Sequence, residues 1–298
     1  MTVIRTVDLS KQFGKVNALN KVNMEVKEGE VYGFIGPNGA GKSTTIRILL
    51  GMLNPSGGQA EVLGMDAKKD AVAIHRRLAY VPGDVNLWPN LTGGEVIDLL
   101  MSFHGVKNKG RKDELIQAFQ FDPSKKCRTY SKGNRQKVAL IAAFAIEPDL
   151  YIFDEPTSGL DPLMERTFQK YVKEARNQGK SILLSSHILS EVEQLCDRVG
   201  IIRDGEMIET GTLEDLRHLT RTNLYVETSR PIDNLETWEG VHDVEKRQSG
   251  VSFQVDTERM ETVMAELGAF GIKKIESAPP TLEDLFMRHY EGSGGGDR

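Results

Sequence analysis

Cysteine is nearly absent from this 298-residue chain, which holds only Cys127 and Cys196. The two lie far apart, and neither belongs to a Cys-x-x-Cys pair or to a His and Cys cluster of metal-binding spacing. Unpaired thiols are typical of proteins kept in a reducing compartment. We therefore expect two buried free thiols in a cytosolic protein.

Long apolar runs are also missing. The longest, Val138–Ile146, has nine residues, whereas a membrane-spanning helix needs about 18 or more. Arg5 and Asp8 interrupt the only apolar stretch near the N-terminus, so we expect no secretory signal. Any work at a membrane must then go through a partner protein.

The chain also lacks a surplus of positive charge. The net charge is −5, and from residue 219 onward 15 acidic residues face 9 basic ones, against 28 and 29 before it. Proteins that bind nucleic acid present clustered basic residues. We therefore expect no nucleic-acid partner, which argues against a protein that acts on DNA or on the ribosome.

Short β-branched runs alternate with helical patterns over the first two thirds of the chain. This alternation is typical of a mainly parallel sheet flanked by helices. The predicted strands are Val3–Val7, Val22–Val26, Val31–Ile35, Leu78–Val81, Leu150–Phe153, Ser181–Ser185 and Val199–Ile202. The predicted helices are Ser43–Met52, Glu95–Phe103, Lys137–Ile146, Pro162–Asn177 and Leu189–Cys196.

After about Arg217 the pattern changes to that of a small α+β domain without a chemical motif. A chain of this length is expected to form two domains, and we place them at residues 1–217 and 218–291, followed by a flexible tail at 292–298. The second domain is predicted to contain strands Asn223–Thr228, Val241–Glu245, Val251–Val255 and Lys273–Glu276, with helices Met260–Leu267 and Thr281–Tyr290.

The segment Gly36–Thr44 reads GPNGAGKST and lies between an apolar strand and a helix. It matches the phosphate-binding pattern GxxxxGK[ST], in which glycines let backbone N–H groups turn toward the oxyanions. The lysine of the pattern reaches the β- and γ-phosphates and the serine ligates Mg²⁺. The alternative is an ordinary glycine-rich turn. The predicted nucleotide contacts are Gly36, Asn38, Gly39, Ala40, Gly41, Lys42, Ser43 and Thr44.

The second half of this site is Leu150–Glu155, which reads LYIFDE. A buried strand that ends in Asp154 would bring a carboxylate near the Mg²⁺. Glu155 could then orient or deprotonate the attacking water. Strand ends often carry exposed acids, but the phosphate loop upstream favours the catalytic interpretation.

From Met1 to about Arg217 the sequence resembles the ABC ATPase family. The resemblance implies an α/β P-loop fold with a mainly parallel core sheet, an antiparallel β subdomain and a helical subdomain at about residues 84–148. It also implies ATP and Mg²⁺ as cofactors and a head-to-tail dimer of two copies. A membrane permease would hold such a chain at the cytoplasmic face of the cell membrane.

The most specific element of the resemblance is Tyr130–Asn134, YSKGN, which is similar to the family signature LSGGQ. That signature binds the γ-phosphate of ATP held by the other subunit, which implies this role for Ser131 and Gly133. Asn134 keeps an amide where the family usually has glutamine, and Lys132 departs from the pattern. Ser131 is also predicted to cap the helix that follows.

Three further elements follow the family order. Ser158–Asp161 (SGLD) matches the D-loop that crosses the dimer interface, which implies a place for Asp161 near the nucleotide. His187 in SSHIL matches the switch histidine that contacts the γ-phosphate. Phe13 stands where the family has an aromatic ring stacked on adenine, and a core phenylalanine is the alternative.

One element departs from the family pattern Y-x-P-Q, whose glutamine contacts Mg²⁺. The chain has Gly83 at that position, followed by Asp84. Asp84 could take over part of the role, because a carboxylate oxygen suits Mg²⁺. It could equally be a turn residue.

Other nucleotide-binding classes lack support. The chain has neither the N-K-x-D element that a GTP-dependent switch protein needs nor the long coiled coil that a chromosome-type ABC ATPase has between the two halves of the site. The segment 278–286 and the YxPG and SKGNRQK variants resemble ATPases of drug- and antibiotic-export systems. This resemblance implies export of a hydrophobic compound. A non-exporting ABC ATPase or a regulatory ATP-binding module is the alternative.

Overall fold

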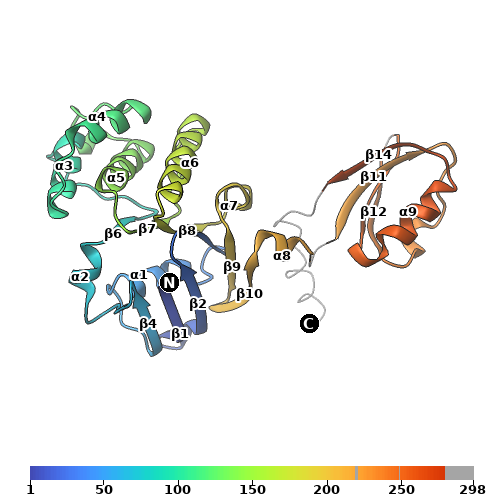
Figure 1. Cartoon of the computed structure of the whole chain (residues 1–298), viewed down its shortest axis with the longest axis horizontal. Coiled ribbons are helices and arrows are strands. Elements are labelled where there is room, and N and C mark those ends of the chain that lie inside the picture. The colour runs from blue at the N-terminus through green and yellow to red at the C-terminus, as the bar shows by residue number, and fades with distance from the viewer. Residues whose placement is uncertain (219–220, 248, 279–298) are drawn as a thin grey trace. The chain divides into compact units, whose positions relative to one another are not determined.

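The chain divides into two compact units, Met1–Thr210 and Gly211–Arg298, in a computed structural model that describes residues 1–218, 221–247 and 249–278 (Figure 1). The division lies just before the boundary expected near Arg217. The predicted helix Thr281–Tyr290 and the predicted tail lie outside the described residues.

The centre of the first unit is a six-stranded sheet of order β10-β9-β3-β8-β7-β6. Its neighbours pair in parallel from β9 through β3, β8 and β7 to β6. The strands are β3 (Val31–Ile35), β6 (Leu78–Val81), β7 (Leu150–Asp154), β8 (Ser181–Ser186), β9 (Arg198–Arg203) and β10 (Glu206–Thr212). Every residue of β3, β7 and β8 is buried, as expected where both faces of a parallel sheet are covered.

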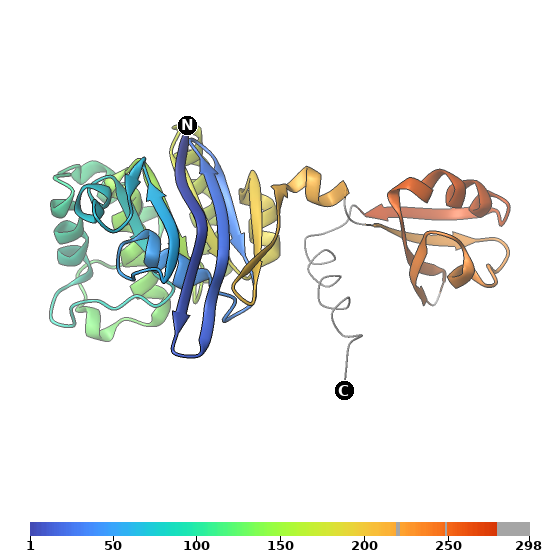
Figure 2. The same cartoon turned by 90° about the horizontal axis from the view of Figure 1, so that it is seen from below.

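A second, antiparallel sheet of order β2-β1-β4-β5 covers one side of this core. Its strands are β1 (Thr2–Phe13), β2 (Val16–Lys27), β4 (Gly57–Val62) and β5 (Met65–Asp66), and Figure 2 shows the long hairpin of β1 and β2. Helix α1 (Lys42–Leu49) packs between the two sheets through Ile46, Ile48 and Leu49. The first turn of α1 is therefore held at the carboxyl edge of β3.

The helical part of the unit contains α2 (Ala71–His75), α3 (Gly93–Phe103), α4 (Lys109–Ala118) and α5 (Lys132–Ile146), with a 3-10 turn at Cys127–Thr129. A capping box of Thr92 and Glu95 begins α3. An aromatic cluster, with ring centroids 5.3 to 6.4 Å apart, connects α5 to β7 and to α6 (Pro162–Asn177). Its members are Phe119, Phe144, Tyr151, Phe153, Phe168 and Tyr171. The last turns of α5, which contain Phe144, are thereby packed against the core sheet.

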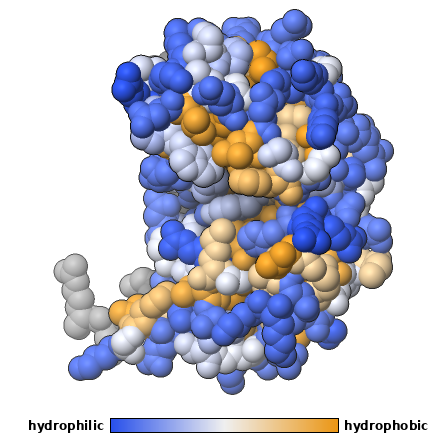
Figure 3. Space-filling model, turned by 90° about the vertical axis from the view of Figure 1, so that its left-hand side faces the viewer, coloured by the Kyte–Doolittle hydropathy of each residue, from blue (hydrophilic) through white to orange (hydrophobic). Residues whose placement is uncertain are grey.

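An apolar groove of about 690 Å³ opens between the helical part and the core of this unit. Residues of α2, α3, α5 and the segment after β6 line it. Four of its large apolar side chains are well exposed, namely Met52, Val72, Trp88 and Phe103. Figure 3 shows hydrophobic residues gathered around a hollow on this face.

Helix α7 (Leu189–Leu195) packs directly on β3. A Cβ atom on Gly33 would come within 2.7 Å of Val192 and 3.0 Å of the Cys196 sulfur, so only glycine permits this approach. Cys127 and Cys196 are both buried and unpaired, which confirms the prediction for them. Burial raises the pKa of both thiols.

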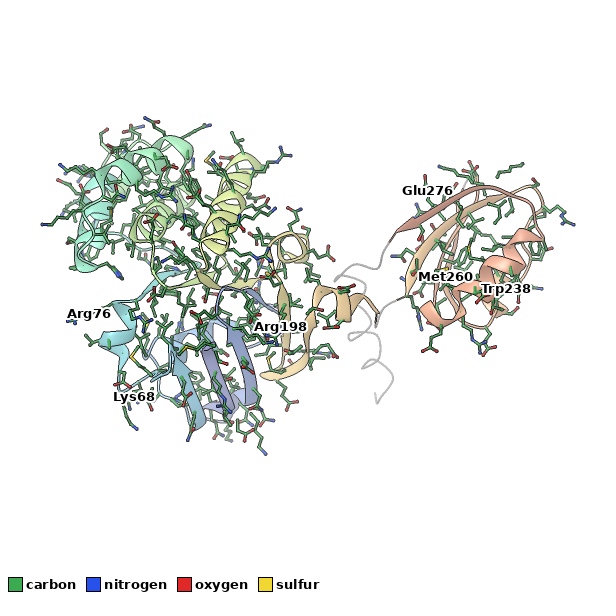
Figure 4. All side chains as sticks on the ribbon, viewed as in Figure 1. Lys68, Arg76, Arg198, Trp238, Met260 and Glu276 are labelled. Atoms are coloured by element: carbon green, nitrogen blue, oxygen red, sulfur yellow. The ribbon has the colours of Figure 1, made fainter. Side chains whose placement is uncertain are left out.

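The second unit begins with α8 (Leu213–His218) and contains an antiparallel sheet of order β12-β13-β11-β14. Its strands are β11 (Thr222–Thr228), β12 (Val241–Lys246), β13 (Val251–Val255) and β14 (Ile272–Ala278). Helix α9 (Met260–Gly268) packs on the sheet through Val263 and Leu267, and 3-10 turns lie at Leu235–Thr237 and Thr257–Arg259. Trp238 and Met260, labelled in Figure 4, border this core. Across the described residues of both units, no helix combines the length and apolar character needed to cross a membrane.

Candidate active site

The loop from Gly36 to Gly41 joins β3 to α1 with a sharp change of direction. Gly41 has a φ of 113°, and a Cβ there would lie 2.7 Å from Leu19, so the position requires glycine. The buried ammonium of Lys42 donates to the carbonyl oxygens of Gly36, at 2.6 Å, and of Pro37, at 3.1 Å. The N–H groups at the start of α1 are suited to an anion because a helix N-terminus carries a partial positive charge.

The other predicted contacts of the loop lie around this cradle. Asn38 and Gly39 are exposed, Ala40 is buried, and Thr44 is half-buried in the first turn of α1. The exposed Ser43 also lies in that turn. The loop therefore presents both backbone and side-chain donors to one site.

Asp154 ends β7 with its carboxyl group buried beside the phosphate loop. Burial raises the pKa of Asp154, and the nearby hydroxyls of Ser43 and Ser185 offset part of the rise. Its Oδ1 has no hydrogen-bond partner among the described residues. Buried polar atoms are rarely left without a partner, and a carboxylate oxygen beside a serine hydroxyl suits a hard cation. The residues present therefore fit Mg²⁺.

Glu155 carries the least usual backbone conformation of the site. Its φ is 51°, in the left-handed region that a side chain other than glycine rarely adopts. Its N–H donates to the Ser185 carbonyl at 2.9 Å. Its Oε1 lies 3.9 Å from Lys42 Nζ and 3.3 Å from Nδ1 of His187, an exposed residue just after β8. The fold thus brings the predicted base, histidine and lysine together.

Two of the residues predicted to face a nucleotide already cap their own helices. Ser131 Oγ accepts from the Asn134 N–H at 3.3 Å at the start of α5, which confirms the predicted cap. Asp161 Oδ1 accepts from the N–H groups of Leu163 and Met164, each at 3.0 Å, and caps α6. These bonds fix the start of both helices.

The signature segment packs on the D-loop of the same chain. A Cβ on Gly133 would approach the Gly159 carbonyl oxygen to 2.4 Å, so the two backbones are in direct contact. Lys132, the departure from the signature pattern, donates from Nζ to Ser158 Oγ at 2.7 Å. Both motifs therefore belong to one continuous surface.

Phe13 ends β1 with 48% of its surface exposed. The alternative of a core phenylalanine is therefore wrong. The ammonium of Lys11 lies 4.9 Å from the centre of the ring. An exposed ring is suited to stacking, and the contact with adenine stays a prediction.

The segment with the missing glutamine lies against the catalytic strand. A Cβ on Gly83 would be 3.0 Å from the Asp154 carbonyl oxygen and 3.5 Å from Glu155 Cβ. Two residues on, the Val85 carbonyl accepts from Arg135 Nε of α5 at 3.1 Å. Asp84, between them, is exposed. The segment therefore connects the end of β7 to the signature helix.

Glu191 is a residue of this region that the sequence reasoning missed. It lies on α7, is only 5% exposed, and accepts hydrogen bonds from Ser186 and Thr157. A signal was present, because Glu191 precedes Leu195 by four residues and so shares its buried helix face. An acid at such a position needs hydrogen-bonding partners.

Two family descriptions match the chain. The family described as "ABC transporter" matches residues 19–158. The description "ATP-binding protein DrrA1-3-like, C-terminal domain" matches residues 211–290, which is most of the second unit. The first match lies in the first unit and the second match in the second unit.

Curated relatives align with much of the chain. The "Bacitracin transport ATP-binding protein BcrA" of Bacillus licheniformis is 33% identical over 297 residues, 96% of this chain and 97% of the relative. The "Probable multidrug ABC transporter ATP-binding protein YbhF" of Escherichia coli (strain K12) is 35% identical over 221 residues, 72% of this chain and 38% of the relative.

Solved structures share the fold of the first unit. An "ATP binding subunit of ABC transporter" has a TM-score of 0.68 and 34% identity, covering 73% of this chain and 92% of its own. A dimeric ATP-binding cassette in a post-hydrolysis state, bound to ADP and phosphate, has a TM-score of 0.65 and 25% identity. The match covers 70% of this chain and 98% of the cassette.

Proposed function

The chain belongs to the family of ABC transporter ATP-binding subunits, and from this premise we propose that it powers export of a hydrophobic, drug- or antibiotic-like compound through a separate membrane permease. Its own activity is ATP hydrolysis. The names of its relatives, a bacitracin transport protein and a probable multidrug transporter, support this class of cargo. A regulatory module without catalysis would have no need of Glu155 and His187 in contact.

The observation that carries the catalytic part is the position of Glu155 between Lys42 and His187. When ATP enters, the Lys42 ammonium turns from its loop carbonyls to the phosphate oxyanions. The Glu155 carboxylate accepts the proton of the attacking water, and His187 holds the carboxylate and the terminal phosphate in place. Asp154 and Ser43 would hold Mg²⁺, which neutralises phosphate charge when bound.

The missing glutamine gives Asp84 a place in this proposal. Gly83 contacts the backbone of the catalytic strand but offers no side chain. Asp84 is the next carboxylate along the segment, and we assign to it the contact with the ion or with its water. Val85 and Arg135 then connect that contact to α5.

The dimer completes the site. Ser131 and Gly133 lie on the surface that includes the D-loop, and one related cassette is dimeric in two solved structures. We propose that this surface of one copy, including Asn134 and Asp161, closes over the ATP bound to Lys42 of the other.

Dilution tests the dimer. We expect the rate of ATP hydrolysis per chain to fall as the protein is diluted, because each site needs residues from two copies. The rate is measured at saturating ATP and Mg²⁺, with albumin keeping the total protein concentration constant as a control for surface loss. A rate per chain that stays constant down to concentrations where light scattering finds only monomer contradicts the shared site.

The permease contact is assigned to the apolar groove beside α3. Exposed apolar patches of this kind mark protein contacts, and the groove runs between the helical part and the core of the first unit. Docking there would hold the chain at the cytoplasmic face of the membrane. The segment of Gly83 and Asp84 borders the groove through Pro82 and Val85, so a permease in it would contact the site indirectly.

Charge placed in the groove tests this contact. We expect Trp88→Glu to abolish co-purification of the chain with its permease from detergent-solubilised membranes, because a carboxylate would be desolvated in an apolar interface. Cells that carry the variant should also lose resistance to the exported compound. Ile208→Glu, which changes an exposed apolar residue on β10, is the matched control. Normal co-purification and resistance with Trp88→Glu would move the permease contact elsewhere.

A further inference from the structure

Glu191 is a buried carboxyl group between two loops of the active site. Its Oε2 accepts from Ser186 Oγ at 2.9 Å and from Thr157 Oγ1 at 3.4 Å. Its Oε1 has no hydrogen-bond partner in the described part of the chain. Burial of a carboxyl group is unfavourable unless the group is hydrogen-bonded, and the partners of these two bonds are the segments that Glu191 connects.

Both partners lie next to a residue of the catalytic pair. Ser186 directly precedes His187, and its Oγ also accepts from the Ile188 N–H at 3.0 Å. The hydroxyl therefore fixes the backbone on both sides of the histidine. Thr157 lies two residues after Glu155, inside the turn closed by the bond from the Ser158 N–H to the Glu155 carbonyl at 3.2 Å.

Glu155 needs such support because of its backbone. A left-handed conformation in a residue other than glycine persists only where the surroundings hold it. The bond to Ser185 holds the N–H of Glu155, but the chain after Glu155 must also be held. The bond from Thr157 to Glu191 supplies that second point.

We infer that Glu191 is a positioning residue: through one oxygen atom it fixes the two loops that bring Glu155 and His187 to 3.3 Å from one another. It does not contact the reacting atoms. This inference rests on the proposed catalytic roles of Glu155 and His187.

The role depends on the accepting oxygen rather than on charge. Burial raises the pKa of Glu191 to about 7; Ser186 and Thr157 oppose the rise, and Glu165 of α6 adds to it. The thiol of Cys196 is a further titratable group of this interior. Oε2 can accept from two hydroxyls whether or not Oε1 carries a proton. A glutamine, whose amide oxygen accepts two bonds, should therefore replace the carboxyl group.

The test compares Glu191→Ala with Glu191→Gln in the full chain. We expect Glu191→Ala to lower kcat for ATP hydrolysis by about 10- to 100-fold with KM for ATP unchanged, because displacement of catalytic groups by about 1 Å has effects of that order. Glu191→Gln should restore most of kcat. Gln194→Ala, an exposed position on the same helix, is the control for substitutions in α7. Thr157→Val and Ser186→Ala, which each remove one of the two bonds to Glu191, replace the alanine variant if it does not fold.

Combining Glu191→Ala with Glu155→Gln distinguishes a positioning role of Glu191 from a general loss of stability. When Glu155 is already glutamine, Glu191→Ala should cause no further loss of kcat, because residues that act as a unit are non-additive. If kcat is unchanged in Glu191→Ala while Glu155→Gln is inactive, the inference about Glu191 is overturned and the proposed function stands. Parallel changes in KM and Tm that glutamine does not rescue overturn it as well. A wild-type chain without hydrolysis, or an active Glu155→Gln, refutes the proposed function instead.

Discussion

Glu155→Gln is expected to lower kcat for ATP hydrolysis by about 10²- to 10⁴-fold, the usual contribution of a general base. The amide has the volume of the carboxylate, so the left-handed backbone at this position and the contact toward His187 are retained. It cannot accept the proton of the attacking water as a carboxylate does. ATP binding should therefore persist, and the dimer should accumulate in its ATP-bound form.

Three measurements test this variant: phosphate release under saturating ATP, ATP affinity by equilibrium titration, and dimer content by size-exclusion chromatography with ATP and Mg²⁺. Glu61→Gln, which changes an exposed carboxylate on β4, is the control. A Glu155→Gln chain that hydrolyses ATP at the wild-type rate would remove Glu155 from the mechanism.

Lys42→Ala is expected to weaken ATP binding by about 100-fold. A charge-assisted hydrogen bond contributes about 1.5–3 kcal/mol, and about 1.4 kcal/mol corresponds to a tenfold change in affinity. The loop already positions the ammonium, because the carbonyl oxygens of Gly36 and Pro37 accept hydrogen bonds from it. Burial lowers the pKa of Lys42, and the carboxylates of Glu155 and Asp154 oppose that change. The Lys42 side chain is thus already positioned to bind an anion, and binding costs little further conformational entropy.

The measurement is the dissociation constant for a non-hydrolysable ATP analogue in the presence of Mg²⁺. Lys68→Ala is the matched control, because Lys68 is an exposed lysine of the same unit and is labelled in Figure 4. Circular dichroism shows whether the variant stays folded, since Lys42 also bonds its own loop. Equal affinities of wild type and Lys42→Ala would place the phosphates away from this loop.

Continuous apolar strands and well-bounded helices could be predicted closely. Val31–Ile35, Leu78–Val81 and Pro162–Asn177 all have the predicted bounds. The β1–β2 hairpin is much longer than predicted, because most of the added residues, 8–13 and 16–21, are not buried and so lack the apolar alternation that predicts a strand. The pairing of such residues depends on the neighbouring strand, so it cannot be predicted from the local sequence.

The residues of the candidate site also fall into those that a local motif predicts and those that only the folded chain brings together. Its phosphate loop needs a fixed spacing of glycine, lysine and serine, so the motif predicts Lys42 and Ser43 directly. Contacts between distant segments leave no such mark: Lys132 meets Ser158 across 26 residues, and Glu191 meets Thr157 across 34. These contacts depend on the packing of α5 and α7 against the core sheet, which only the folded chain shows.

The two buried thiols have a practical consequence for measuring closure of the dimer. Thiolate is the reactive form of cysteine, and both access and a low pKa are needed for alkylation. Cys127 and Cys196 are at most 7% exposed, and burial raises the pKa of each. A spin label or fluorophore carried by maleimide should therefore leave the native chain unmodified. A single cysteine introduced at an exposed position can then report distances between copies without prior removal of either native thiol.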